Sequence, residues 1–305
     1  MELIKPDINI DFISKRRYAA VISVVLILVG LAALVLRGGP NYGVDFAGGT
    51  VVQVRFNQPT DAVQIKDLLV PEVLASAVVQ RFGDEDNEFL IRAEESDNGL
   101  QGMRTALVQK LEQEYGDGSV EVRRVEMVGP QVGKDLRKKG LMAIVYAMVG
   151  ILIYISWRFE LRFAVGAIVA LLHDVTLTFG AFSLFDKEIG LPIIAAFLAI
   201  IGYSLNDTII VYDRIRENRG RYNDKSFADL INRSINDTLS RTILTSTTTL
   251  LVVLSLFIFG GGVIHDFAFA LLIGVIVGTY SSIYVASPML LLWDKFQNKK
   301  VQEKS

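Results

Sequence analysis

Asp207 is the residue of this 305-residue chain whose setting most strongly suggests chemistry. It lies inside the apolar run 191–212, which is long enough to cross a bilayer. A carboxylate in the hydrocarbon costs on the order of a few kcal/mol unless it faces a protein cavity or a partner, so an intramembrane acid is a candidate functional residue. The alternative is a structural aspartate that caps a helix or forms a pair near a helix end.

Two further charged residues have related settings. Asp174 lies about halfway along the apolar run 163–185, and Arg241 stands immediately before the run 242–260. The runs that carry the two acids are joined by a short loop and are expected to be antiparallel neighbours, so both acids and the arginine could share one polar cavity. Such a group is typical of a proton relay. The alternative for Arg241 is a side chain that extends to the membrane surface, and His173 is expected to be a hydrogen-bonded core residue.

Other kinds of chemistry lack the residues that they need. The chain has no cysteine, which excludes disulfides and thiolate metal sites, and its two histidines, His173 and His265, are too far apart to suggest a zinc site. No GxxxxGK[ST] loop for ATP and no Ser/His/Asp arrangement is recognised, so neither catalysis nor a bound cofactor is expected. The net charge of −2 gives no basic footprint for nucleic acid.

Membrane spans are the elements that must position these residues. Hydrophobic residues make up 51% of the chain and the mean hydropathy is +0.40, which is too apolar for a water-soluble globule of this size. A multi-pass α-helical membrane protein is therefore predicted. Its six transmembrane helices are expected at residues 18–37, 139–157, 163–185, 191–212, 242–260 and 266–293.

The region between the first two spans, residues 38–135, is predicted to form a small α+β domain. Alternating and helical spacing of apolar residues indicates six elements. They are strands at 51–56, 73–82, 89–93 and 119–128 and helices at 60–69 and 99–115, the first helix opening with a capping Thr60. The order β-α-β-β-α-β is the ferredoxin-like pattern. Many unrelated proteins share it, so this fold alone does not indicate a function.

The distribution of basic residues predicts the orientation in the membrane. Six spans place both termini on one side and the α+β domain on the other. Lysines and arginines are concentrated on the side of the termini, at 15–17, 158–162, 214–241 and 295–300. A cluster at 134–139 is the exception on the other side. The termini, 1–17 and 294–305, are therefore expected in the cytoplasm and the domain outside.

Three further patterns concern packing. The cytoplasmic segment 213–241 has apolar residues on one helical face, which predicts an amphipathic helix on the membrane surface or against a partner. The Ser/Thr stripe of span 242–260 could line a cavity or form hydrogen bonds between helices. Gly274 and Gly278 in the last span are a small-xxx-small pair, which is typical of close helix packing.

Six short motifs together resemble the SecD/SecF family. They are 42–50 (YGVDFAGGT), 128–133 (VGPQVG), 170–175 (ALLHDV), 202–218 (GYSLNDTIIVYDRIREN), 240–246 (SRTILTS) and 278–287 (GTYSSIYVAS). The resemblance runs almost from end to end, and both GYSLNDT and the small domain are closer to the SecF branch than to the SecD branch. The residues that match the family signatures are Asp45, Phe46, Gly48, Gly49, Asn206 and Thr208.

This resemblance implies a non-enzymatic accessory subunit of the Sec protein translocase in the bacterial cytoplasmic membrane. Members of the family pair with SecD, associate with the SecYEG channel and use the proton motive force to promote translocation of unfolded secretory polypeptides, in contact with membrane lipids. The key acid of the family falls on Asp207 and its essential arginine on Arg241, whereas Asp174 is a weaker match. A further essential acid is expected on SecD, outside this chain.

Three alternatives stay open from the residues. Sodium could replace the proton as the coupling ion, because the Ser/Thr-rich fifth span could supply oxygen ligands. The chain could instead be a proton-coupled exporter of small molecules or lipids of the resistance-nodulation-division type, for which its outer domain is small. It could also be a purely structural scaffold for SecD, with the acids as packing remnants. Replacing Asp207 by asparagine separates the scaffold from the ion-coupled subunit.

Overall fold

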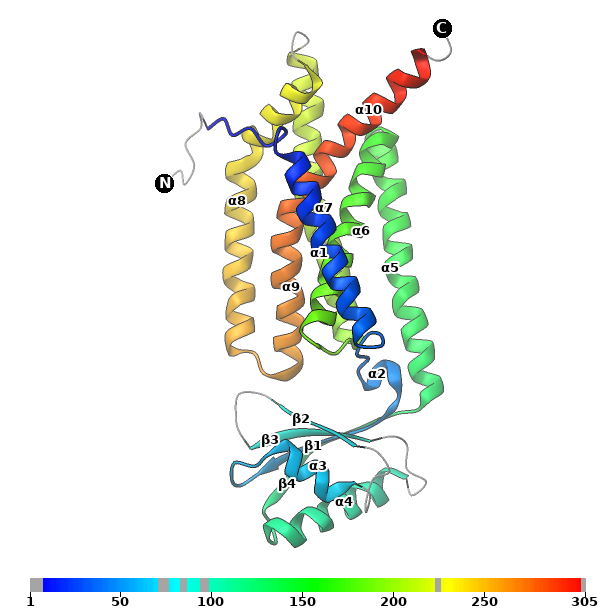
Figure 1. Cartoon of the computed structure of the whole chain (residues 1–305), viewed down its shortest axis with the longest axis vertical. Helices are drawn as coiled ribbons and strands as arrows, with labels where there is room; N and C mark the ends of the chain where they lie inside the picture. Colours follow the sequence, from blue (N-terminus) through cyan, green and yellow to red (C-terminus); the bar gives the residue numbers. More distant parts are fainter. Residues whose placement is uncertain (1–7, 71–76, 83–86, 94–98, 223–225, 303–305) are drawn as a thin grey trace.

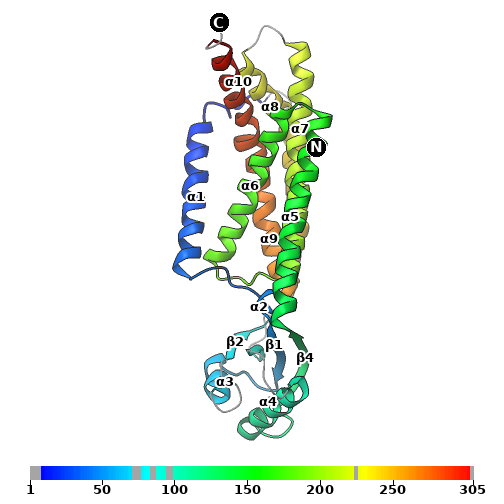
Figure 2. The ribbon, with the colours of Figure 1, turned by 90° about the vertical axis from the view of Figure 1, so that its right-hand side faces the viewer.

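A computed structural model gives the structure of the chain and describes residues 8–70, 77–82, 87–93, 99–222 and 226–302. A bundle of long helices carries a small α+β domain at one end (Figure 1). The start of α1 and the end of α10 both lie at the opposite end of the bundle (Figures 1 and 2). The predicted placement of the domain and the chain ends at opposite ends of the bundle is therefore observed.

Six helical segments of the described chain are long and apolar enough to cross a membrane, as predicted. Five of them are α1 (Arg16–Leu36), α5 (Pro130–Arg158), α6 (Leu161–Leu184), α7 (Leu191–Arg221) and α8 (Phe227–Phe259). The sixth is bent and consists of α9 (Gly262–Ser281), the π-helical turn η1 (Ser282–Ala286) and α10 (Ser287–Gln302). Proline stands in the first turn of both α5 and α7, where its missing N–H costs no helical hydrogen bond.

The α+β domain has the predicted ferredoxin-like arrangement. Its elements are α2 (Val44–Ala47), β1 (Gly49–Phe56), α3 (Ala62–Leu69), β2 (Ala77–Arg81), β3 (Glu88–Ala93), α4 (Gly99–Tyr115) and β4 (Val120–Val128). The sheet order is β2-β3-β1-β4 with antiparallel neighbours. Helices α3 and α4 cover the face turned away from the bundle (Figure 1) and enclose a core that includes Phe56, Phe89 and Leu107. Part of the predicted strand 73–82 lies outside the described residues.

The start of α3 differs from the prediction by one capping residue. The N-cap is Asp61, whose Oδ1 accepts a hydrogen bond of 2.7 Å from the Val63 N–H. Thr60, the predicted cap, instead donates its hydroxyl to the Gln58 carbonyl oxygen at 3.1 Å. Asp and Thr are both good N-cap residues, so two adjacent candidates cannot be ranked from the sequence alone.

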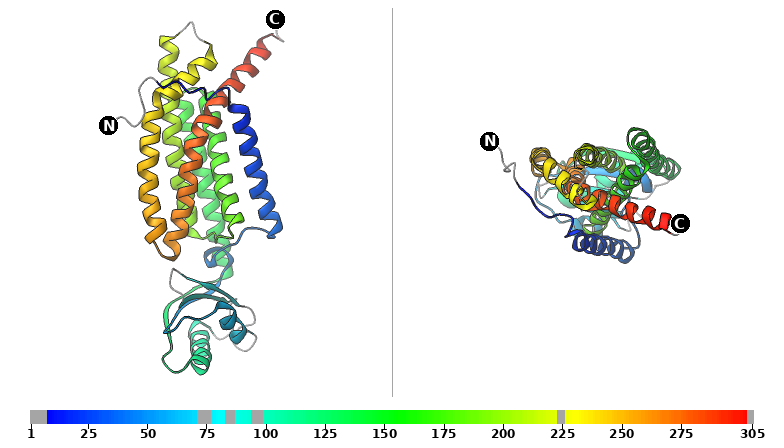
Figure 3. Two further views of the ribbon diagram at one scale, coloured as in Figure 1. Left: turned by 60° about the vertical axis from the view of Figure 1, so that its left-hand side comes forward. Right: turned by 90° about the horizontal axis from the view of Figure 1, so that it is seen from above.

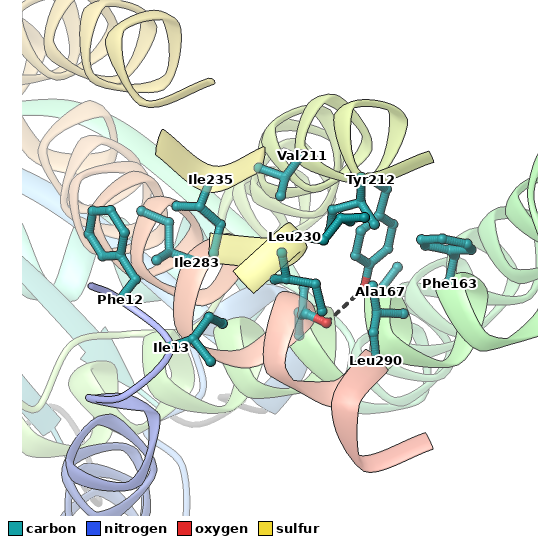
Figure 4. Close-up of a cluster of buried hydrophobic side chains, with 14 of the residues drawn as sticks. Phe12, Ile13, Phe163, Ala167, Val211, Tyr212, Leu230, Ile235, Ile283 and Leu290 are labelled. Atoms are coloured by element: carbon teal, nitrogen blue, oxygen red, sulfur yellow. Dashed lines mark hydrogen bonds between the residues drawn. The ribbon is translucent and has the colours of Figure 1, made fainter. Parts of the chain in front are cut away.

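The apolar face predicted at residues 227–239 is buried against other parts of this chain, and not against the membrane surface or a separate partner, the two settings that the sequence suggested. Both α7 and α8 continue beyond their apolar spans and pack against each other there (Figure 3). Leu230, Ile231 and Ile235 of α8 join Tyr212 of α7 and Phe12 in one buried cluster (Figure 4). The first part of α8 is inclined to its span (Figure 1), and its apolar face contacts protein.

Two asparagines of α8 fix the segment that precedes α1. The Asn236 Oδ1 atom accepts from the Ile10 N–H and the Asn232 Oδ1 atom accepts from the Phe12 N–H, each at 2.8 Å. Both amide groups also donate to the Ile10 carbonyl oxygen. These bonds satisfy backbone groups that no sheet or helix serves, and they hold the segment before α1 against the first part of α8.

The glycine-rich signature forms the joint between the domain and the bundle. The Asp45 Oδ2 atom accepts a 2.9 Å hydrogen bond from the N–H of Leu191, the first residue of α7. Gly48 has a φ of +79°, and a Cβ there would lie 2.8 Å from the Pro130 Cα at the start of α5. Phe46 is buried among bundle residues. The motif therefore places the domain against the first turns of two membrane helices.

Close packing of α9 on α7 explains the glycine pair of the last span. A Cβ on Gly274 would lie 2.3 Å from the Ile200 Cγ1 atom, and a Cβ on Gly278 would lie 2.9 Å from the Ser204 Cβ atom. Small residues let two helix backbones approach in a membrane. The predicted packing role is confirmed, and α7 is thereby held in the middle of the bundle.

Candidate functional site

Asp207 is buried on α7, with 1% of its surface exposed. Its Oδ2 atom has no hydrogen-bond partner, and the carboxylate makes no hydrogen bond or ion pair with any described residue. A buried polar atom without a partner is costly, and a buried charge more so. The alternative of a capping or paired structural aspartate therefore finds no support among the described contacts.

The neighbouring helix α8 carries two polar residues at the start of its apolar run. Thr242 is buried, and its Oγ1 atom also lacks a hydrogen-bond partner. Arg241 is exposed, and its positive charge acts on Asp207 without a salt bridge within 4.0 Å between described residues. The site therefore combines a buried acid with a cation that acts on it without forming an ion pair.

Asp174 has the opposite environment. Its Oδ2 atom accepts hydrogen bonds from the hydroxyls of Ser204 on α7 (2.5 Å) and Ser281 on α9 (2.7 Å). Its Oδ1 atom lies 2.9 Å from the His173 Nδ1 atom, and the Nε2 atom of this histidine lies 2.9 Å from the Ser23 Oγ atom on α1. One fully buried carboxylate thus ties together α1, α6, α7 and α9.

The structure gives the predicted relay residues different roles in the bundle. Among the described residues, no hydrogen bond joins the Asp174 network to Asp207 or Arg241. Asp207 and Arg241 come together on α7 and α8, as expected, whereas both carboxylate oxygens of Asp174 are occupied by helix-linking bonds. The proton-relay role of these three residues stays a prediction, and it fits Asp207 and Arg241 better than Asp174.

The structure reveals an arrangement that the sequence did not indicate. Ser23, His173 and Asp174 form a Ser–His–Asp chain of hydrogen bonds, although Ser23 is 150 residues from the histidine. The Ser23 hydroxyl also lies 3.1 Å from that of Tyr280, which donates to the Ala19 carbonyl oxygen at 2.7 Å. The predicted core role of His173 is confirmed, and the chain of bonds holds α1 against the bundle.

The Ser/Thr stripe of α8 has two uses. Ser246 bonds across helices, with its Oγ atom 2.7 Å from the Thr279 Oγ1 atom and 3.2 Å from the Tyr203 hydroxyl oxygen. Thr245 and Thr248 instead donate to carbonyl oxygens of α8 itself. Of the two alternatives for this stripe, interhelical bonding is observed for Ser246, while the buried Thr242 hydroxyl has no hydrogen-bond partner among the described residues.

The signature NDT on α7 divides between two faces. Thr208 is buried, whereas Asn206 is exposed and makes no hydrogen bond with a described residue. Arg241 is exposed beside the same acid. Exposed amide and guanidinium groups within apolar spans are expensive in lipid and normally face protein or water. Asn206 is thus an exposed polar group inside the apolar run 191–212, and Arg241 is one at the start of the run 242–260.

The fold and the site define a class of protein before any comparison is made. It is a polytopic membrane protein with a buried carboxylate inside one of its apolar helices. No group of three or more His, Cys, Asp or Glu that could hold a metal ion occurs in the described part of the chain.

Comparison with known proteins gives the family. The family described as "Protein export membrane protein SecD/SecF, C-terminal" matches residues 107–296, and the "SecD/SecF GG Motif" matches residues 35–60. The chain belongs to the SecD/SecF family. It is similar to the protein translocase subunit SecF of Magnetococcus marinus, at 51% identity over 96% of this chain and 94% of the relative. The SecF of Calditerrivibrio nitroreducens is 47% identical, over 96% of each chain.

Solved structures agree with this placement. The crystal structure of SecDF, described as a translocon-associated membrane protein, from Thermus thermophilus matches with a TM-score of 0.86 and 37% identity. The match covers 96% of this chain but 40% of that one. A second SecDF structure, in a super-membrane-facing form, matches with a TM-score of 0.73 and covers 100% of this chain. The chain therefore spans less than half the length of SecDF.

Proposed function

We propose that this chain is the SecF-type accessory subunit of the Sec protein translocase. With SecD it uses the proton motive force to promote translocation of secretory proteins across the bacterial cytoplasmic membrane, and it acts by movement, not by catalysis. The observation that carries this proposal is the buried, unpartnered Asp207 carboxylate beside Arg241 in a chain whose relatives are translocase subunits. Those relatives do not favour an exporter of small molecules or lipids.

SecD is the proposed occupant of the face formed by α7 and α8. Asn206 and Arg241 are exposed there without partners among the described residues, and a membrane neighbour would supply them. The SecDF structures that the chain resembles contain both halves in one protein, of which this chain corresponds to 40%. The missing half would bring its own acid to Arg241. The contacts with the SecYEG channel and with the unfolded polypeptide belong to the same proposal.

The coupling step is a change of charge at Asp207. When ionised, the acid attracts the guanidinium of Arg241; when protonated, it does not, so the preferred packing of α7 against α8 and SecD differs between the two states. The balance between two packings of a bundle depends on the difference between their free energies, so a charge that favours one packing shifts the balance toward it. We favour the proton over sodium, because a proton needs only the unpartnered Oδ2 atom of Asp207, whereas a sodium ion needs several oxygen ligands around it.

The outer domain is the element that would move. It is joined to the bundle by the Asp45 bond to Leu191, by continuity through β4 into α5, and by an ion pair between Arg92 of β3 and Glu188 of the α6–α7 loop. These contacts connect the domain to the helix that carries the acid. The basic residues at the other end of the bundle support cytoplasmic termini and an extracytoplasmic domain.

The test is export of a reporter protein in cells whose sole copy of the chain carries Asp207→Asn, with co-purification of SecD as the assembly control. Loss of export with SecD retained is expected. Asp213→Asn is the matched control, because this acid lies on the same helix but is half exposed and pairs with Arg216. Normal export by Asp207→Asn would favour the structural scaffold. Export that requires sodium and resists a proton uncoupler would replace the proton by sodium.

A further inference from the structure

A groove on the side of the bundle formed by α1, α6 and α10 has no role in the proposed ion coupling. It has a volume of about 770 Å³, within the range of about 300–1,000 Å³ typical of ligand sites. Its walls are mainly apolar and include Val24, Ile27, Leu172, Met289 and Leu292. Figure 2 shows α1 as the outermost helix on this side, next to α6. The groove therefore faces the hydrocarbon of the membrane.

The bend of the last span explains why this space is not filled by protein. The π-helical turn η1 and Pro288 follow one another between α9 and α10. A π-turn widens a helix and proline removes a backbone donor, so the helix changes direction there. Figure 1 shows α10 leaning away from the axis of α9. The leaning helix forms one wall of the groove, while the Ser23–His173 contact closes its inner side.

The mouth of the groove is basic. Arg16 and Arg17 at the start of α1 and Lys295 on α10 line it, and no acidic residue lines the groove. Arg16 donates from Nη1 to the Ile13 carbonyl oxygen at 2.8 Å, which leaves its other guanidinium nitrogens available. Among the described residues, Arg17 and Lys295 have no ion-pair partner. Three cations at the mouth of an apolar groove match an anionic head group that carries an acyl chain.

The length of the groove matches one leaflet of a bilayer. Its lining on α1 runs from Arg16 to Ile27, which spans roughly 16 Å at the helical rise. Half of the hydrocarbon core of a bilayer is about 15 Å thick. The cations therefore lie at the level of the head groups while the apolar walls extend to the middle of the membrane. The leaflet concerned is the one on the side of the chain ends, whose surface is negative in the proposed orientation.

We infer that this groove binds an anionic phospholipid, with its phosphate at Arg16, Arg17 and Lys295 and one acyl chain between α1, α6 and α10. The bound lipid would add to the contacts that hold α1 to the bundle at this end, beside the Ser23–His173 bond. In the bilayer segment of α1, Ala19, Ser23 and Gly30 are the buried residues. The inference does not depend on ion coupling through Asp207, and its test does not require transport.

The two tryptophans of the chain allow a direct test. Trp293 adjoins the lining residue Leu292, whereas Trp157 is 88% exposed at the end of α5. In the full chain with Trp157→Phe, reconstituted in phosphatidylcholine vesicles, Trp293 reports contact with a small fraction of brominated lipid. Brominated phosphatidylglycerol is expected to quench it more strongly than brominated phosphatidylcholine. A membrane-surface cation contributes about fivefold to anionic lipid binding, so R16Q/R17Q/K295Q should abolish the preference.

A second variant separates a site from a diffuse layer of anionic lipid. Ala20→Phe places a ring in the groove and keeps all three cations, and it is expected to abolish the preference as well. If only the charge variant lost the preference for phosphatidylglycerol, the site would be overturned. Equal quenching of the parent by both brominated lipids would overturn it too. The chain with Trp293→Phe retains Trp157 as its fluorophore. In this chain neither the charge variant nor Ala20→Phe should change the quenching by brominated lipid, and a change would overturn the assignment. Displacement by water-soluble glycerol phosphate would also overturn it, because a free phosphate would then suffice.

Discussion

Removing the two hydroxyls that hold Asp174 should destabilise the bundle without stopping export. Ser204 and Ser281 donate to its Oδ2 atom at 2.5 Å and 2.7 Å from two different helices. Hydrogen bonds between membrane helices average about 0.6 kcal/mol and reach about 1.7 kcal/mol. Bonds to a buried charge lie at the upper end, since the acceptor is left unsatisfied. The double variant Ser204→Ala/Ser281→Ala should therefore lose about 1–3 kcal/mol of unfolding free energy.

Asp207→Asn should give the reverse result. Its carboxylate makes no hydrogen bond with a described residue, and its Oδ2 atom is unpartnered, so the substitution breaks no contact and removes a buried charge. The unfolding free energy should stay within about 0.5 kcal/mol of the parent or rise, while export is lost. The assay is equilibrium unfolding of the purified chain in mixed micelles of mild detergent and dodecyl sulfate, followed by circular dichroism, beside the export measurement.

The matched control for the serine variant is Ser255→Ala. This hydroxyl lies on an exposed part of α8 and donates to the Leu251 carbonyl oxygen of its own helix at 3.0 Å. It should change the unfolding free energy little. The reasoning would be refuted if the serine pair could be removed at no cost, or if Asp207→Asn destabilised the bundle more than the serine pair does. Either result would mean that the assignment is reversed, with Asp207 holding the helices together and Asp174 free to act in coupling.

Three other outcomes follow from single contacts. Gly278→Leu should prevent α9 from packing on α7, because even a Cβ would lie 2.9 Å from the Ser204 Cβ atom, and the variant should fail to give a monodisperse peak in size-exclusion chromatography. Asp61→Ala should cost the outer domain about 1 kcal/mol in chemical unfolding through loss of the α3 cap, while Thr60→Ala changes it little. Burial raises the pKa of Tyr115, so stability that is complete below about pH 10 should decline above it. Tyr115→Phe should remove that alkaline decline in a thermal unfolding series.

Periodicity and composition predicted the elements of the fold but not all of their contacts. The six apolar runs and the β-α-β-β-α-β order carry local signals, and both appear in the structure. The apolar face of residues 227–239 correctly indicated burial, yet the pattern cannot say what covers it. The cover is Tyr212 and the segment around Phe12, which are distant in sequence. Local spacing therefore predicts that a helix face is buried, whereas only the tertiary structure shows which residues cover it.

The sequence also could not predict that Asp174 and Asp207 have different hydrogen-bond environments. Asp174 and Asp207 each interrupt an apolar run, and by spacing alone both fit a relay. What separates them is the presence of donors on other helices, with Ser281 lying 107 residues from Asp174. The same limit hid Ser23 as the partner of His173. The resemblance to a family ranked the two acids where spacing could not, because family motifs retain information that single-chain spacing lacks, and that ranking stays a prediction.

Helix α7 is the element through which a charge change could reach the outer domain. Its first N–H is bonded to Asp45 of the domain joint, and Asp207 lies 16 residues further along, roughly 24 Å away at the helical rise. Ser204, one turn before the acid, is tied to Asp174, so the helix is anchored beside the site and cannot bend there freely. A repacking of α7 against α8 would therefore move the helix as a unit. The joint would receive that movement through Leu191, where the domain is attached.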